Sequence, residues 1–406
     1  MSRIAVCVMT YNHPDTIEDV LKESVDDYKE LGIDIYYYDT SENEDTRNII
    51  KDWQHRGYDN LYCVDYAPKE LAVPKMFQVI EGKGLQKEYD YIWPIKDRSW
   101  CPRATLEQIM EAVERGYDAI FLGVGGEIGQ NTEYSRAELF YRDWGWLATS
   151  IDVTIFKRDS MIATYYRMVG EQIYERDRIC GWYHYSTLLY MFYWKNNPLV
   201  YVICNEEAKI NNSQLSKSGW EERIFEIWKD SWIEINESLP DVYDEYKAYI
   251  TKKGASLPWI LGNVLRLMEL HEKGILTSEN CGEVLQNWER VSNISPSVVQ
   301  RIACGNYDPY HETSAISIRS YAGTILLKLI SIIKTGNVSK EQIPIEEVSL
   351  CIRQEIIQNA RFQSEKKYLI LGTVDDIIDY ARKEEAKTEE IGRLLQALLV
   401  ILFLAE

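Results

Sequence analysis

The chain has 406 residues, more than one compact core usually holds, so two domains are expected. Hydrophobic residues make up 46% and charged residues 27%, the profile of an ordinary globular protein. The formal net charge of -19 repels phosphate backbones and anionic lipid, which argues against nucleic acid and against a membrane surface as partners.

The cysteines and the apolar runs indicate a cytoplasmic protein. The eight cysteines include no CxxC pair and no His/Cys ligand spacing, so they are interpreted as thiols of a reducing compartment. The N-terminus shows no charged start followed by an apolar signal core. The longest apolar run, Leu394 to Leu404, is too short to cross a bilayer and predicts a packed or oligomerising helix. Peripheral membrane attachment is the alternative, without a transmembrane segment.

The first half alternates apolar runs with helical patterns. Strands are predicted over residues 4–9, 33–38, 61–64, 89–95 and 119–124. Helices are predicted from a capping box at Asp15 and Glu18 to Gly32, over 46–55, from near Pro74, and around 106–113. This alternation predicts an α/β fold with a mostly parallel sheet and helices on both faces. Ligands of such sheets bind outside the carboxyl ends of the strands.

The later chain changes character twice. Residues 125–146 are rich in glycine and polar side chains, which indicates a loop over a site. A strand over 151–156, a helix over 186–194 and a strand over 199–204 follow. From about 217 helical patterns dominate, over 222–237, 243–250, 260–272 and 316–333. The polar stretch 211–219, a linker or a lid, is therefore the predicted boundary between domains 1–215 and 216–406.

Two predicted strands end in sequence motifs that resemble those of a known enzyme family. The opening IAVCVMTYNHPDTIEDVL and the segment IYYYDTSENEDT resemble the first two strands of family-2 glycosyltransferases with the GT-A fold. The resemblance implies that Thr10, Tyr11 and Asn12 bind the donor nucleoside and that Asp39 accepts a hydrogen bond from the base. A tyrosine can stack on a pyrimidine, and a carboxylate can accept from an imide N–H. The alternative for Asp39 is that it only caps the following turn.

The third match departs from the family pattern. In the segment YDYIWPIKDRSWCPRATLEQI, the family's Asp-any-Asp motif falls on Ile95-Lys96-Asp97, so the first carboxylate is missing. The resemblance implies that Asp97 coordinates a divalent metal, Mn²⁺ or Mg²⁺, that bridges the donor phosphates. Lys96 and Arg98 flank Asp97 and can neutralise a diphosphate, or can be ordinary solvated charges. Lys75 is a further candidate for the diphosphate.

The general base of the family is also replaced. Inverting members place a Glu-Asp pair before the last sheet strand, and here the segment GWYHYSTLLYMFYWKNNPLVYV carries Tyr183-His184-Tyr185 instead. His184 is the candidate base, because a neutral imidazole accepts protons near pH 7. A packed core histidine is the alternative. Asp177 is the reserve candidate, and Asp152 could reach the site if the loop moves.

These motifs predict an inverting, metal-assisted glycosyltransferase that moves a sugar from a UDP-sugar to a saccharide, glycoprotein or lipid-linked acceptor. The helical domain would hold the acceptor, a partner or a second copy of the chain. Two other functions stay open. Because two expected carboxylates are absent, the protein could be an inactive scaffold or a sugar-nucleotide-binding subunit. A nucleotidyltransferase is the third, although TYNHPD lacks the glycine-rich basic loop that such enzymes carry.

Overall fold

The computed structural model describes most of the first 307 residues and parts of the remainder. The described residues are 3–64, 79, 81–124, 126, 129–173, 182–195, 197–213, 215, 220–257, 259–307, 326, 329–330, 333, 343, 345, 349, 374–383 and 387–405. The chain divides into two compact units, Met1–Ile260 with Arg290–Ser292, and Leu261–Glu289 with Asn293–Glu406.

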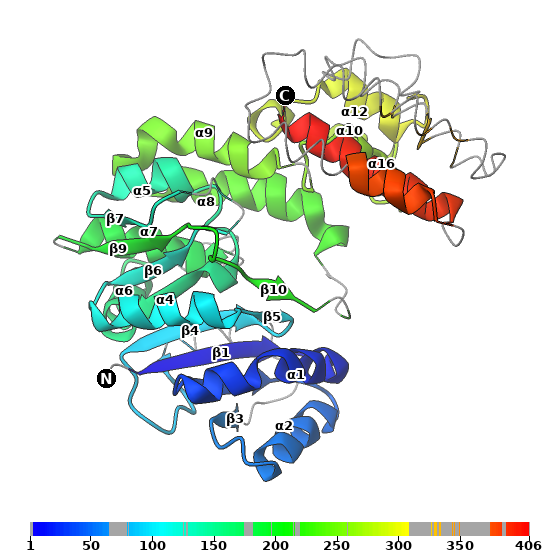
Figure 1. The fold of residues 1–406 in the computed structure, drawn as a ribbon. Helices are drawn as coiled ribbons and strands as arrows, with labels where there is room; N and C mark the ends of the chain where they lie inside the picture. Colours follow the sequence, from blue (N-terminus) through cyan, green and yellow to red (C-terminus); the bar gives the residue numbers. More distant parts are fainter. Residues whose placement is uncertain are drawn as a thin grey trace. The chain divides into compact units, whose positions relative to one another are not determined.

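The first unit is built on an eight-stranded sheet with the order β3-β2-β1-β4-β8-β6-β9-β7 (Figure 1). Its strands are β1 (Ile4–Thr10), β2 (Asp34–Asp39), β3 (Leu61–Val64), β4 (Tyr91–Lys96), β6 (Ala119–Leu122), β7 (Thr132–Tyr134), β8 (Thr154–Lys157) and β9 (Val200–Ile203). Only β7 and β8 run antiparallel to their neighbours in the sheet. Every residue of β2 and of β6 is buried, so both faces of the sheet are covered. The predicted α/β fold with a Rossmann-like, mostly parallel sheet is confirmed.

Helices of the first unit pack on the sheet and on one another. They are α1 (Pro14–Glu30), α2 (Asp45–His55), α4 (Arg103–Glu114), α5 (Ala137–Trp144), α6 (Arg158–Gly170), α7 (Tyr183–Trp194), α8 (Trp232–Ser238) and α9 (Asp244–Ala255). In α1 the buried positions Ile17, Leu21, Val25 and Tyr28 recur at helical spacing. The predicted capping box is wrong, because His13 is the N-cap residue and Asp15 lies inside the helix.

Two other sequence predictions change in the structure. The expected loop over 125–146 contains β7 and α5, and its glycines have a packing reason. A Cβ atom at Gly123 or Gly126 would lie 2.7 or 2.6 Å from the ring of Trp144. The helix expected near Pro74 lies outside the described residues. The helical region does begin near 220, but α8 and α9 pack against the first unit, so the division between the units falls at Ile260 rather than near 215.

All regular secondary structure described in the second unit is helical. It contains α10 (Val264–Glu272), α11 (Cys281–Val284), α12 (Pro296–Ala303) and α16 (Thr388–Ala405). The apolar C-terminal run forms α16, in which Ile391, Leu395 and Leu398 are buried. Among the described residues no helix is both long and apolar enough to cross a membrane.

A buried amide joins the helical end of the first unit to its α/β part. The Asn236 side-chain oxygen in α8 accepts hydrogen bonds from the hydroxyls of Tyr141, at 2.7 Å, and Tyr185, at 2.8 Å. Its amide nitrogen donates to the carbonyl of Trp232 at 2.7 Å. All three linked side chains are fully buried. One amide therefore satisfies hydroxyls from both α5 and α7.

We predict that Asn236→Ala lowers the free energy of unfolding by about 2–3 kcal/mol, because it removes the acceptor that the two buried hydroxyls share and leaves them only each other as partners. Tyr185→Phe removes one donor and leaves no orphan, so it should cost only about 1 kcal/mol. Urea unfolding followed by circular dichroism measures both values. Equal losses for the two variants would contradict the role assigned to the amide.

Candidate functional site

The chain reverses its direction of travel across the sheet at β1. From β1 it moves to β2 and β3 on one side, and β4 then pairs with the other edge of β1. The carboxyl ends are level, since Thr10 lies opposite Asp39 and Met9 lies opposite Lys96. Open α/β sheets bind ligands in the crevice at such a switch point. The polar ends of β1, β2 and β4 therefore define the candidate site.

An ion pair spans this switch point. The Nδ1 atom of His13, just after β1, lies 2.8 Å from the Oδ2 atom of Asp97, just after β4. The Asp97 side chain is 12% exposed and that of His13 is 40% exposed. One carboxylate oxygen of the predicted metal ligand is thus already held by the protein. The sequence prediction missed His13, although its place directly after the Thr-Tyr-Asn motif marked it as a neighbour of the site.

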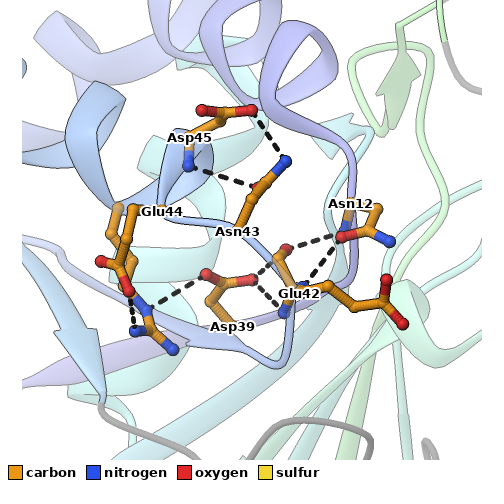
Figure 2. Close-up of polar contacts among 8 residues, drawn as sticks. Asn12, Asp39, Glu42, Asn43, Glu44 and Asp45 are labelled. Carbon is orange, nitrogen blue, oxygen red and sulfur yellow. Dashed lines mark hydrogen bonds and ion pairs between the residues drawn. The ribbon is translucent and has the colours of Figure 1, made fainter.

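Asp39 is held in a buried network at the end of β2 (Figure 2). Its Oδ1 atom accepts hydrogen bonds from the backbone N–H and the hydroxyl of Ser41. Its Oδ2 atom lies 3.4 Å from Nε of Arg47 and accepts no hydrogen bond in the described structure. Asp39 therefore does cap the turn, and a base could reach Oδ2 only if the Arg47 side chain moved. Nearby, the hydroxyls of Thr40 and Thr46 are also buried without a hydrogen-bond partner in the described structure.

Reciprocal hydrogen bonds join the loops after β1 and β2 (Figure 2). The backbone N–H of Asn12 donates to Ser41 Oγ at 2.8 Å, and its side-chain oxygen accepts from the backbone N–H of Glu42 at 3.1 Å. Asn12 adopts φ 53°, a left-handed conformation that asparagine tolerates. Tyr11 is 44% exposed, and its hydroxyl donates to Glu42 at 3.3 Å. Tyr11 is thus partly exposed directly after the carboxyl end of β1.

Lys96 is committed to an internal partner. Its ammonium lies 2.9 Å from Oδ2 of Asp152 and donates to the hydroxyl of Ser150 at 2.8 Å, while its backbone N–H donates to Asp152 Oδ1 at 2.6 Å. Burial works to raise the pKa of Asp152, but the charge and hydrogen bonds of Lys96 outweigh it and hold that pKa below its usual value. Asp152 is 3% exposed, so it anchors the end of β4.

Arg98 lies in the turn between β4 and the short strand β5 (Ser99–Trp100), and backbone hydrogen bonds hold this turn in place. The strand β5 pairs with β10 (Asn211–Asn212), and the carbonyl of Arg98 accepts from the backbone N–H of Ser213 at 2.8 Å. The stretch that the sequence left as a linker or a lid is thus partly fixed onto this turn. Arg98 itself is half-buried. Its guanidinium forms no ion pair or hydrogen bond in the part of the chain that the structure describes.

His184 lies at the start of α7 and is 6% exposed. Its Nε2 atom is 3.0 Å from the carbonyl of Thr149, which makes Nε2 the protonated nitrogen, and Nδ1 is buried without a hydrogen-bond partner. Burial lowers the pKa of His184 to about 4, and the charge of Lys96 acts in the same direction, against the hydrogen bond to Thr149. The imidazole is therefore neutral at pH 7. Such a low pKa makes it a weak base.

The family resemblance implies a divalent metal at Asp97. No group of three or more His, Cys, Asp or Glu side chains that could hold a metal occurs among the described residues. Ile95 takes the place of the first carboxylate and is 4% exposed, and His13 holds one oxygen of Asp97. The described residues do not fit a metal centre built by the protein. Lys75 and Asp177 lie outside the described residues.

A pocket of about 540 Å³ opens beside the switch point, at the N-terminus of α1. Its lining includes Asn12, His13, Asp15, Glu18, Asp19 and Leu215. Three carboxylates against one lysine, Lys22, make this wall acidic. A diphosphate at the switch point would face that negative charge, so it needs a cation on the other side.

Comparisons with known proteins give structural neighbours only. No family model matches the chain, and no curated protein sequence matches it. TarS of S. aureus in complex with UDP-GlcNAc is 13% identical, with 75% of this chain and 89% of that chain covered and a TM-score of 0.42. The mannosyltransferase PcManGT from Pyrobaculum calidifontis, in complex with GDP-Man and Mn²⁺, is 14% identical, with 75% and 86% covered and a TM-score of 0.39.

A third neighbour is the 4-diphosphocytidyl-2C-methyl-D-erythritol synthase from Anaerococcus prevotii, 11% identical, with 52% of this chain and 94% of that chain covered and a TM-score of 0.33. The first two neighbours are nucleotide-sugar glycosyltransferases, the class that the sequence motifs resemble. At these TM-scores none of the three assigns a residue role to this chain.

The burial of His184 predicts a pH-dependent stability. Its folded pKa, about 4, lies below the ordinary value of 6.5, so its contribution is fully present above pH 6.5 and is lost as pH falls toward 4. Between pH 7 and pH 5 this one group should remove about 2 kcal/mol from the free energy of unfolding. His184→Gln keeps a donor for Thr149 and should reduce the pH effect by that amount in urea unfolding.

The matched control is His55→Gln, which changes an exposed histidine in α2. Its pH effect should equal that of the wild type. An undiminished pH effect in His184→Gln would show that the imidazole is not the buried, neutral group described above.

Proposed function

We propose that the protein is a glycosyltransferase that moves a sugar from a nucleotide-diphosphate donor, a UDP-sugar, to an acceptor hydroxyl. The observation that carries the proposal is the level convergence of three polar strand ends, at Thr10, Asp39 and Lys96, on one switch point. A nucleotide is the ligand that suits such a crevice. The exposed ring of Tyr11 beside it suits stacking on a base.

The donor site is proposed residue by residue. Thr10, Tyr11 and Asn12 would contact the nucleoside, and Asp39 would accept from the imide N–H of uracil after Arg47 has moved off Oδ2. The diphosphate would lie toward the turn at residues 96–98, with Lys75 as a further candidate cation. Lys96 would act by holding that turn against Asp152, since its ammonium is already engaged.

The reaction is proposed as an inverting, in-line displacement. The acceptor hydroxyl attacks the anomeric carbon, the bond to the diphosphate breaks, and the hydroxyl proton passes to a general base. His184 and Asp177 are the candidates for that base. For His184, proton transfer at neutral pH would need a change in its surroundings that raises the low pKa. The resemblance implies a divalent metal on Asp97, which would stabilise the negative charge of the leaving group. No step proposed here depends on that metal.

A second candidate function is a subunit that binds a nucleotide sugar without transferring it. The observation in its favour is the weak basicity of the buried His184, together with Ile95 in place of the first carboxylate. Release of nucleoside diphosphate from a nucleotide sugar separates the two functions. Under either one, we place the protein in the cytoplasm. We also propose that the helical unit serves the acceptor, a saccharide, glycoprotein or lipid-linked saccharide, or a second copy of the chain.

The test begins with binding. We predict that UDP raises the melting temperature and that Tyr11→Ala weakens its binding by about 10- to 100-fold, because base–aromatic stacking contributes about 1–3 kcal/mol. Tyr11→Phe keeps the aromatic ring and removes the hydroxyl that donates to Glu42 at 3.3 Å, so it should bind UDP as the wild type does. Thermal shift and calorimetric titration measure both. Tyr11 is exposed, so neither change should disturb folding.

A panel of UDP, GDP and CDP identifies the donor class, and UDP-sugars then test turnover. No stabilisation by any nucleoside diphosphate would contradict the proposed function. Binding without release of UDP, over a range of acceptors, would favour the non-catalytic subunit.

A further inference from the structure

The turn after β4 carries three consecutive charged residues, and two of them already have a partner within the protein. Lys96 is paired with Asp152 at 2.9 Å, and Asp97 is paired with His13 at 2.8 Å. Arg98 has no ion pair or side-chain hydrogen bond within the described residues, although it is half-buried. The Arg98 guanidinium has five N–H donors, and none of them donates to an acceptor within the described residues. It can therefore donate to an anionic ligand.

The backbone beneath Arg98 is held from two sides. Asp152 fixes the end of β4 through the N–H of Lys96 and the hydroxyl of Ser99, at 2.6 and 3.2 Å. The neighbouring strand β10 pairs with β5, and the hydroxyl of Ser99 also donates to Asn212 at 3.0 Å. The turn is thus pre-organised at the switch point, which reduces the entropy lost when a ligand is bound.

An anionic ligand at the turn after β4 needs a positive charge from the protein or from a metal. A nucleoside diphosphate is anionic, the protein carries a net charge of -19, and the pocket wall at α1 is acidic. A metal could supply the missing positive charge, but the described residues do not assemble a metal centre around Asp97. The His13 imidazole instead occupies the position beside that carboxylate.

We propose that Arg98 binds the donor diphosphate through charge-assisted hydrogen bonds and that this binding does not require a divalent metal. The planar guanidinium can donate two parallel N–H bonds to phosphate oxygens, which a point charge on lysine cannot reproduce. The hydrogen bond from His13 holds one oxygen of the Asp97 carboxylate, so that oxygen already has a partner within the protein. This inference rests on the proposed function, because it assigns the diphosphate end of the same donor site.

The experiment is a calorimetric titration with UDP and with uridine, in buffer with EDTA and in buffer with Mn²⁺. Wild type should bind UDP with similar affinity in both buffers. Arg98→Met should weaken UDP binding by about 10- to 100-fold in EDTA, the value expected for lost hydrogen bonds to a charged group. Uridine binding should be unchanged, because uridine has no phosphate. The affinity of Arg98→Lys for UDP should lie between those of the wild type and Arg98→Met.

Arg103→Met is the matched control. Arg103 lies five residues further on, is exposed, and is paired with Glu107 at 2.9 Å, so its loss should leave UDP binding unchanged. Two results would overturn the inference while the proposed function stands. The first is UDP binding that EDTA abolishes and Mn²⁺ restores, and the second is Arg98→Met binding UDP as tightly as wild type. No binding of UDP or uridine in either buffer would overturn the proposed function itself.

Discussion

The hydrogen-bonded register of β1 against its two neighbours is the constraint on which the site depends. β1 pairs in parallel with β2 and β4, so the residues that end the three strands lie at one level. All three strands are almost completely buried, and a slip by one residue would exchange the side chains that pack on the two covered faces of the sheet, which disfavours other registers. The convergence of Thr10, Asp39 and Lys96 follows from that register.

Burial then decides which charges at this edge remain available. Removing a charge from water is costly unless it is paired, and the site shows three pairs, Lys96 with Asp152, Asp39 with Arg47, and Asp97 with His13. Each pair engages a side chain that the motifs alone would assign to ligand binding. The pairs also stiffen the loops, since each one joins segments that are separate in the sequence or in the fold. What is left for an anionic ligand is Arg98.

The same reasoning applies to the catalytic group. A histidine near pH 7 is a good base only where solvent or a negative charge supports its protonated form. His184 is buried beside Trp182 and Tyr183, and this burial together with the charge of Lys96 outweighs the support that the Thr149 carbonyl and the charge of Asp152 give to its protonated form. A glycosyltransferase built on this site would therefore need substrate, or residues near Asp177, to complete its proton transfer.

The sequence by itself determined the alternation of strands and helices, the mostly parallel sheet and the strand ends to examine, because hydrophobic periodicity and the end of each apolar run are local signals. It also marked Tyr11, Asp39, Asp97 and Arg98 as candidates through their motifs. Only the tertiary structure decided which of these carry a free charge. The partner His13 follows β1, Arg47 lies in α2 and Asp152 lies just before β8, and no local pattern predicts a contact across 84 or 56 residues. The division at Ile260 was decided in the same way, by packing of α8 and α9 that helical periodicity alone cannot reveal.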